Sequence, residues 1–232
     1  MPKEGEKKMP LNESKGNMYP WVTHTHTHLG GECPHKCVYC YVDNPRFGRP
    51  KRYTGKLRLI EEEFGVDYGA GKTIFIEHCN DLFAKEVSDH FINMVLDHCR
   101  FYPKNTYVFQ TKNPARYLDF AFDFKAIFGT TIETNRVIEG ISTAPTPYER
   151  YRVMKTISRG KFVTIEPVLD FDVEVLSAWI RDIKPEFLNL GADSKKRNLP
   201  EPTVAKIMEL VAKLKEYGIE LREKHNLKRL KP

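Results

Sequence analysis

The chain has 232 residues, of which 41% are hydrophobic and 29% are charged, and its formal net charge is +6 at pH 7. This length suits one domain that buries a substantial core. The sequence has no apolar run of the roughly 20 residues that a membrane-spanning helix needs, and because residues 1–8 are charged with no apolar stretch behind them, we expect no secretory signal. We therefore expect a cytoplasmic protein with no membrane partner.

The first part of the chain predicts a flexible tail followed by a strand. Residues 1–18 are polar and rich in Lys, Glu and Gly, so we expect a loosely held tail before a single domain over 19–232. In the segment 21–28, threonine and histidine then alternate from Thr23 to His28, and this period of two favours a strand. Its histidine face could line a polar interior, contact a substrate or bind a metal; a satisfied buried histidine is the simpler interpretation for each one singly.

The remainder of the chain alternates between strand and helix patterns. This alternation predicts an α/β fold, a parallel (β/α) partial or open TIM-type barrel with about six or seven strands. The expected strands are 21–28, 73–76, 106–109, 126–132, 161–165, 186–190 and 219–221, and the expected helices are 87–99, 114–122, 147–157, 173–183 and 204–216.

Two of these helices have apolar stripes that should face the core. The first stripe consists of Val87, Phe91, Met94, Val95 and His98. The last helix, which Thr203 should cap, has a stripe of Val204, Ile207, Met208, Val211 and Leu214.

Three of the five cysteines, Cys33, Cys37 and Cys40, follow the spacing C-x3-C-x2-C. Three thiolates cannot pair into disulfides without leaving one over, but they can converge on one metal centre. A zinc site completed by His24, His26, His28 or His35 is the alternative. Structural zinc sites usually use two separate ligand pairs, so the motif favours an iron–sulfur cluster. Cys79 and Cys99 are isolated thiols, and an auxiliary cluster is not expected.

Polar residues follow the predicted strands at their carboxyl ends, where the chemistry of a β/α barrel collects. Each one singly is about as well explained as a cap or turn residue. Their recurrence after successive strands predicts a polar ring around the cysteine loop. The ring consists of Glu77 to Asp81, Lys112, Glu133, Asn135, Glu166 and Asp193.

The cysteine spacing, with Tyr39 just before the last cysteine, resembles the cluster-binding loop of the radical S-adenosylmethionine (SAM) superfamily. Gln110-Thr111-Lys112 and Thr130-Thr131-Ile132-Glu133 look like elements of spore photoproduct lyase relatives. Thr111-Lys112 and Val163-Thr164-Ile165-Glu166-Pro167 together resemble a small phage- and archaea-associated radical SAM family of undefined reaction. The resemblance covers most of residues 21–222.

The resemblance implies an enzyme that cleaves SAM reductively to a 5′-deoxyadenosyl radical, with a reductant such as flavodoxin or ferredoxin. Cys33, Cys37 and Cys40 would bind a [4Fe-4S] cluster whose fourth iron SAM chelates. The implied SAM-binding residues are Tyr39 for adenine, Asn80 and Asp81 for the ammonium, Lys112 for the carboxylate, Thr131 and Glu133 for the ribose, and Glu166. Candidate substrate contacts are His26, His28, Asp193 and again Glu166.

A basic stretch over 46–58 contains Arg46, Arg49, Lys51, Arg52, Lys56 and Arg58 and has no acidic residue. With Phe47 and Tyr53 interleaved it could bind phosphate or nucleic acid, and a solvated loop is an equally good interpretation. A nucleotide or nucleic acid is therefore the candidate substrate. The alternative function is a non-enzymatic nucleic-acid-binding protein stabilised by zinc or by a cluster.

Overall fold

The structure is a computed structural model that describes residues 9–15, 18–42, 51–194 and 197–230. The predicted tail thus lies partly outside the described residues, as do positions 46–50 of the basic stretch. The chain divides into two compact units. The N-terminal unit comprises residues 1–36, 40–111 and 116–127, and the C-terminal unit comprises residues 37–39, 112–115 and 128–232. Among the described residues, none of the helices is both long and apolar enough to cross a bilayer.

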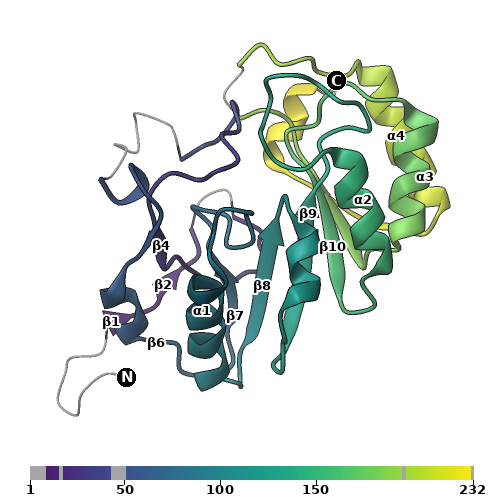
Figure 1. Ribbon diagram of the computed structural model, residues 1–232. Coiled ribbons are helices and arrows are strands. Elements are labelled where there is room, and N and C mark those ends of the chain that lie inside the picture. The colour runs from purple at the N-terminus through teal and green to yellow at the C-terminus, as the bar shows by residue number, and fades with distance from the viewer. Residues whose placement is uncertain (1–8, 16–17, 43–50, 195–196, 231–232) are drawn as a thin grey trace. The chain divides into compact units, whose positions relative to one another are not determined.

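The N-terminal unit contains a mostly parallel sheet beside one long helix (Figure 1). Its strand order is β8-β7-β3-β2, and only the β2–β3 pair is antiparallel. These elements are β2 (Asn12–Glu13), β3 (His24–His26), β7 (Thr73–Ile76), β8 (Thr106–Thr111) and the helix α1 (Asp89–Phe101). Short strands β1 (Met9–Pro10) and β6 (Val66–Asp67) pair with each other, as do β4 (Leu29–Gly30) and β5 (Arg58–Leu59). Part of the predicted tail is therefore held by strand pairing.

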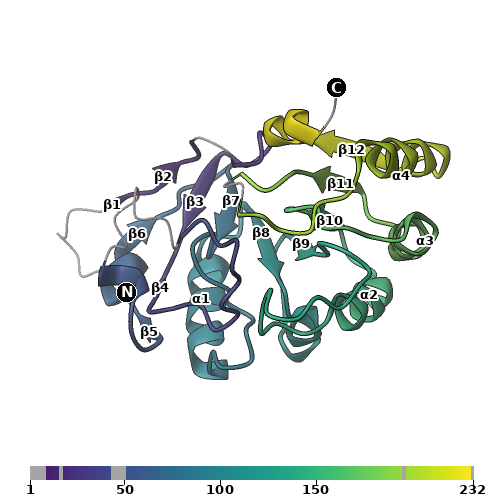
Figure 2. The same cartoon turned by 90° about the horizontal axis from the view of Figure 1, so that it is seen from above.

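The C-terminal unit repeats the strand–helix alternation with parallel strands only. Strands β9 (Ala126–Thr131), which begins in the N-terminal unit, β10 (Lys161–Ile165), β11 (Phe187–Leu190) and β12 (Glu220–Glu223) follow the order β9-β10-β11-β12. Helices α2 (Pro147–Thr156), α3 (Val173–Ile183) and α4 (Val204–Glu216) lie along one side of these strands (Figure 2). The predicted α/β fold is confirmed. Apart from the short β1–β6 pair, seven strands of the described residues, β3 and β7 to β12, pair in parallel.

Helix starts follow local capping chemistry. The Ser88 side chain accepts a hydrogen bond from the backbone of Phe91, so α1 begins two residues later than predicted. Thr146 and Glu149 form a capping box at α2, and the side chain of Thr203 caps α4 as predicted. The predicted helix over 114–122 is instead a short 3₁₀ helix, Pro114–Asp119. Further 3₁₀ turns are Lys51–Tyr53, Glu61–Gly65 and His225–Leu230.

The predicted strand over 21–28 was too long, and both predicted helix stripes were partly wrong. The strand keeps only His24–His26, because the chain then turns to pair β4 with β5. On α1, Met94 is exposed, and the buried face consists of Ile92, Val95, Leu96, His98 and Cys99. On α4, Val204 and Met208 are exposed, and the buried face consists of Ile207, Leu210, Val211 and Leu214. The α1 stripe was thus predicted one position out, whereas Ile207, Val211 and Leu214 of the α4 stripe are buried as predicted; the errors arise because apolar residues also occur on the solvent side.

Each unit contains one of the two tryptophans, stacked on a tyrosine. In the N-terminal unit, the rings of Trp21 and Tyr19 lie 5.6 Å apart with an interplanar angle of 2°. In the C-terminal unit, Trp179 of α3 stacks on Tyr151 of α2 at 4.8 Å and 7°. Such aromatic pairs add stabilisation beyond the apolar area that they bury.

Candidate active site

The cysteine motif lies in a loop without helix or strand after β4. Gly31 begins the loop with φ of +90°, and a Cβ at this position would lie 2.3 Å from the carbonyl oxygen of Lys56, so only glycine fits here. Cys33, Cys37 and Cys40 are each partly exposed, and none of them forms a disulfide. Three accessible thiols within eight residues are a donor set that suits iron. In number and type these donors suit the predicted cluster, which stays a prediction.

The middle of the loop belongs to the C-terminal unit. There the thiol of Cys37 lies 3.3 Å from the hydroxyl of Ser142, and the amide of Val38 donates to the carbonyl of Ile141 at 3.0 Å. These contacts fix the second cysteine against the chain that follows β9. No sequence pattern predicts a role for Ser142, because a lone serine in a loop has no distinguishing neighbours.

The predicted ammonium-binding pair, Asn80 and Asp81, follows β7 and supports the beginning of the cysteine loop. Asp81 is 6% exposed; its Oδ1 accepts hydrogen bonds from the hydroxyl of Thr111 at 2.6 Å and the amide of Phe83 at 3.0 Å. Its Oδ2 lies 2.9 Å from Nε2 of His35, within the loop. The side-chain amide of Asn80 donates to the carbonyl of Gly31 at 3.2 Å. Both residues thus position the loop in the N-terminal unit.

A buried charge cluster in the C-terminal unit brings together several predicted SAM-binding residues around Glu133. The carboxylate is 3% exposed; its Oε1 accepts from Nζ of Lys112 at 2.7 Å and from the hydroxyl of Tyr39. Its Oε2 accepts from Nη1 of Arg150 at 2.7 Å, and the same nitrogen donates to the carbonyl of Thr131 at 2.8 Å. Lys112 also lies over the ring of Tyr39, with its Nζ 5.1 Å from the ring centroid. Tyr39, Lys112, Thr131 and Glu133 therefore belong to one network.

The two cations, Lys112 and Arg150, keep Glu133 ionised. Burial alone would raise the pKa of Glu133, but Lys112 and Arg150 outweigh burial and hold that pKa well below its ordinary value. Burial, followed by the charge of Glu133, raises the pKa of Tyr39 well above its ordinary value. Glu133 is therefore an anion and Tyr39 a neutral donor at neutral pH. A small cavity of about 70 Å³ adjoins the cluster, with Glu133, Ser142 and Arg150 in its lining.

Sequence reasoning missed Arg150, which completes the cluster. This arginine is 3% exposed and lies on the buried face of α2 together with Tyr151 and Met154. The signal in the sequence was the spacing of Arg150 and Met154. Residues four apart lie on the same face of a helix, so Arg150 shares the apolar face of α2, whereas the other charged residues of the helix face solvent.

The two remaining predicted acids of the C-terminal unit follow neighbouring strands. Glu166 comes directly after β10, and its carboxylate accepts from Nζ of Lys224 at 2.7 Å and Nδ2 of Asn226 at 2.8 Å. Asp193 follows β11 and accepts from the backbone amide of Arg197 at 2.6 Å. Because β9, β10 and β11 are parallel, Glu133, Glu166 and Asp193 follow the same edge of the sheet.

The predicted substrate contacts His26 and His28 are buried, with exposures of 2% and 0%. Burial lowers the pKa of both imidazoles, that of His28 to about 3. The ring nitrogens of His26 contact Tyr68 and Glu63. Those of His28 contact Glu77, His98 and Tyr68.

The described part of the basic stretch is partly used to build the N-terminal unit. Arg52 donates to Glu63 at 2.7 Å and to the carbonyl of Thr27, and Arg58 donates to four backbone carbonyls of its own loop. Lys51 and Lys56 are exposed. A hollow of about 400 Å³ beside this stretch is lined by Arg52, Arg58, Leu59, Ile60, Glu61 and Glu62.

The chain is similar to known structures in fold, but its sequence identity to them is low. No family model and no curated protein matches the chain. A mutant of spore photoproduct lyase matches with a TM-score of 0.64 and 12% identity, over 94% of this chain and 79% of the other. Spore photoproduct lyase complexed with dinucleoside spore photoproduct matches with a TM-score of 0.56 and 13% identity, over 87% and 63%. Streptococcus suis SuiB bound to S-adenosylmethionine matches with a TM-score of 0.57 and 9% identity, over 90% and 52%, so the chain spans about half the length of SuiB. These similarities confirm the predicted fold: the chain shares the partial-barrel architecture of spore photoproduct lyase and SuiB.

Proposed function

We propose that the chain is a radical SAM enzyme that binds one [4Fe-4S] cluster through Cys33, Cys37 and Cys40. The observation that carries this proposal is the set of three partly exposed thiols, in a C-x3-C-x2-C loop, on a fold shared with a SAM-bound structure. When bound, such a cluster supplies the electron for reductive cleavage of SAM to methionine and a 5′-deoxyadenosyl radical. The three cysteines need to be deprotonated to bind iron.

The charge cluster around Glu133 supplies the groups that we assign to SAM. A carboxylate has about four acceptor positions, and the donors Tyr39, Lys112 and Arg150 use three of them, so Glu133 can accept one ribose hydroxyl. We assign the ammonium of Lys112, which has three N–H donors, to the SAM carboxylate. The Lys112 side chain is 13% exposed, compared with 3% for Glu133.

The other SAM contacts follow the resemblance. We assign the backbone of Tyr39 to adenine, Thr131 to the ribose, and Asn80 with Asp81 to the ammonium. Because Asp81 already holds His35, Thr111 and Phe83, its first role is to position the cysteine loop. Glu166 can serve SAM or substrate, since it follows the same sheet edge as Glu133.

For the substrate we propose a nucleotide or nucleic acid, with flavodoxin or ferredoxin as the reductant. The support is the exposed lysines of the basic stretch and the similarity to a structure complexed with dinucleoside spore photoproduct. SuiB, which is similar in fold, was also determined with a precursor peptide, so the fold alone does not select a substrate. Asp193 is the proposed substrate contact, whereas the buried rings of His26 and His28 take no part in the proposal.

Anaerobic reconstitution with iron and sulfide tests this function. We expect about four iron and four sulfide per chain, a brown protein, and release of 5′-deoxyadenosine when SAM and dithionite are added. Cys37→Ala should lose the cluster and the product, whereas Cys79→Ala, outside the motif, should keep both.

A colourless protein that holds zinc at these cysteines and releases no 5′-deoxyadenosine would contradict the proposal. Nucleic-acid binding that falls steeply with salt and needs no SAM would then favour a non-enzymatic binding protein.

A further inference from the structure

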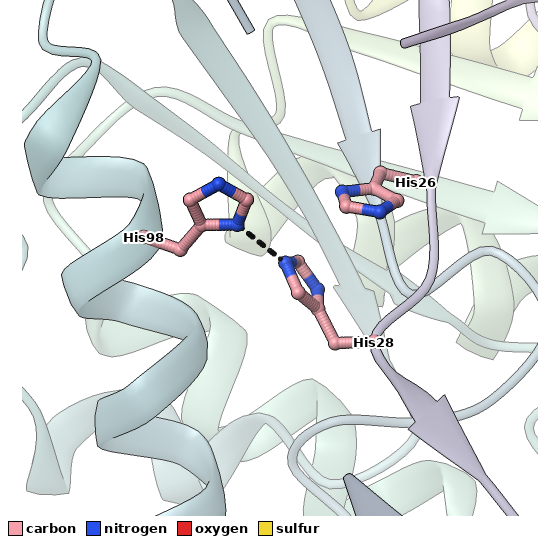
Figure 3. Close-up of side chains that lie close together, drawn as sticks. All are labelled: His26, His28 and His98. Atoms are coloured by element: carbon pink, nitrogen blue, oxygen red, sulfur yellow. Dashed lines mark hydrogen bonds between the residues drawn. The ribbon is translucent and has the colours of Figure 1, made fainter. Parts of the chain in front are cut away.

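Three buried histidine rings meet in the N-terminal unit, outside the proposed SAM site (Figure 3). His26 comes from β3, His28 lies two residues further along the chain, and His98 comes from α1. Their exposures are 2%, 0% and 8%, and one ligand nitrogen from each ring lies within 4.8 Å of the other two. Figure 3 shows the rings turned toward one another.

Each ring is oriented by an acceptor on the nitrogen that points away from the group. Nε2 of His26 lies 2.6 Å from Glu63, Nδ1 of His28 lies 2.8 Å from Glu77, and Nε2 of His98 lies 3.0 Å from the carbonyl of Val66. A carbonyl can only accept, so Nε2 of His98 carries the proton and Nδ1 has a lone pair. Carboxylates impose the same choice on His26 and His28. Such acceptors behind the ring are typical of histidines that bind a metal.

The inward nitrogens therefore present lone pairs to one another. Nε2 of His28 and Nδ1 of His98 are 2.9 Å apart, and the hydroxyl of Tyr68 lies 2.5 Å from Nδ1 of His26 and 3.1 Å from Nε2 of His28. One hydroxyl has one proton for three lone pairs. Protonating more than one ring would place like charges on buried rings whose centroids are 4.3 Å and 5.2 Å apart, which is costly.

We propose that Nδ1 of His26, Nε2 of His28 and Nδ1 of His98 bind a zinc ion, with the Tyr68 hydroxyl beside the fourth position. Zinc–nitrogen bonds of about 2.0–2.1 Å in a tetrahedron place ligand nitrogens about 3.3 Å apart, so the 2.9 Å pair has to open by a few tenths of an ångström. Neutral imidazole suits zinc. Glu63 behind His26 and Glu77 behind His28 offset part of the added positive charge, since Arg52 already pairs with Glu63.

We assign the site a structural role, because its three ligands are at most 8% exposed and the Tyr68 hydroxyl lies beside the fourth position, which a catalytic zinc keeps open to substrate. The metal would fasten α1 to the segment that contains His26 and His28 and leads through β4 into the cysteine loop. This site does not depend on the iron–sulfur cluster: it uses nitrogen donors, whereas the loop offers thiols.

Metal content in a background without the motif cysteines tests the proposal. The full chain with Cys33, Cys37 and Cys40 all changed to Ala should purify with about one zinc per chain. In that background His98→Gln should lower the zinc content at least tenfold. The matched control, His90→Gln, changes an exposed histidine on the same helix and should retain the zinc.

X-ray absorption at the zinc edge of the cysteine-free background supplies a second readout that does not require the His98 variant to fold. We expect imidazole scattering and no sulfur shell, and a melting temperature that a strong chelator lowers and added zinc restores. A zinc-free protein whose melting temperature ignores both treatments would overturn the proposal, as would zinc bound through sulfur or retained in full by a folded His98→Gln variant.

Discussion

Replacing Arg150 by Met should destabilise the C-terminal unit strongly, because the change leaves Glu133 buried with one cation instead of two. Breaking a buried ion pair costs about 3–5 kcal/mol, and we expect about 3 kcal/mol here since Lys112 remains on Glu133. Two carbonyls, of Thr131 and Pro145, also lose their guanidinium donor. For a chain of this length the melting temperature should fall by about 6–12 °C.

The pH dependence of the free energy of unfolding is a second test of the role of Arg150. Because the pKa of Glu133 is held below its ordinary value of 4.5, its stabilisation is complete above that pH and is lost as the pH falls toward the folded-state pKa. The free-energy difference between wild type and Arg150→Met should therefore be largest near neutral pH and shrink below pH 4.5. Urea unfolding of both proteins, followed by circular dichroism at several pH values, measures this free-energy difference.

The control is Arg152→Met, which removes an exposed arginine from the same helix and should change the free energy of unfolding by less than about 0.5 kcal/mol. A cost for Arg150→Met no greater than that of this control would refute the interpretation, as would a cost that does not vary between pH 3 and pH 7.

Three further predictions concern SAM binding and stability. Lys112→Met should weaken SAM binding at least tenfold in equilibrium dialysis, whereas exposed Lys125→Met should not; equal affinities would remove Lys112 from the site. Gly129→Ala should cost about 1–3 kcal/mol or more in urea unfolding, because the new Cβ would lie 2.2 Å from the buried ring of Phe162; a neutral effect would mean that this ring can move. Thr203→Ala should cost about 1 kcal/mol through loss of the α4 cap, and an unchanged melting temperature would show that the cap contributes nothing.

Strand and helix positions were predictable where the local signal was strong. The strands over 73–76 and 161–165 and the helix over 173–183 have the predicted bounds, because apolar runs and periodic stripes fixed them. The alternation of threonine and histidine alone did not show that the strand ends at His26. That turn depends on the pairing of β4 with β5, which are far apart in sequence.

The charge cluster shows a similar limit at the candidate site. Lys112 and Glu133 were predicted from the ends of strands, where polar residues collect. Arg150 was not, because its burial depends on how α2 packs, and an arginine on a helix normally faces solvent. The histidine group is predictable only in part: the alternation over 23–28 indicates His26 and His28, whereas His98 falls within a predicted apolar stripe.

Because each unit contains one tryptophan, stacked on a tyrosine of the same unit, tryptophan fluorescence can follow the two units separately. Trp21→Phe leaves Trp179 as the sole indole of the chain, and Trp179→Phe leaves Trp21. Intrinsic fluorescence of the two variants would therefore report the melting of each unit independently. Superimposable denaturation curves would mean that both units unfold in one cooperative step, and separated midpoints would reveal a half-folded intermediate.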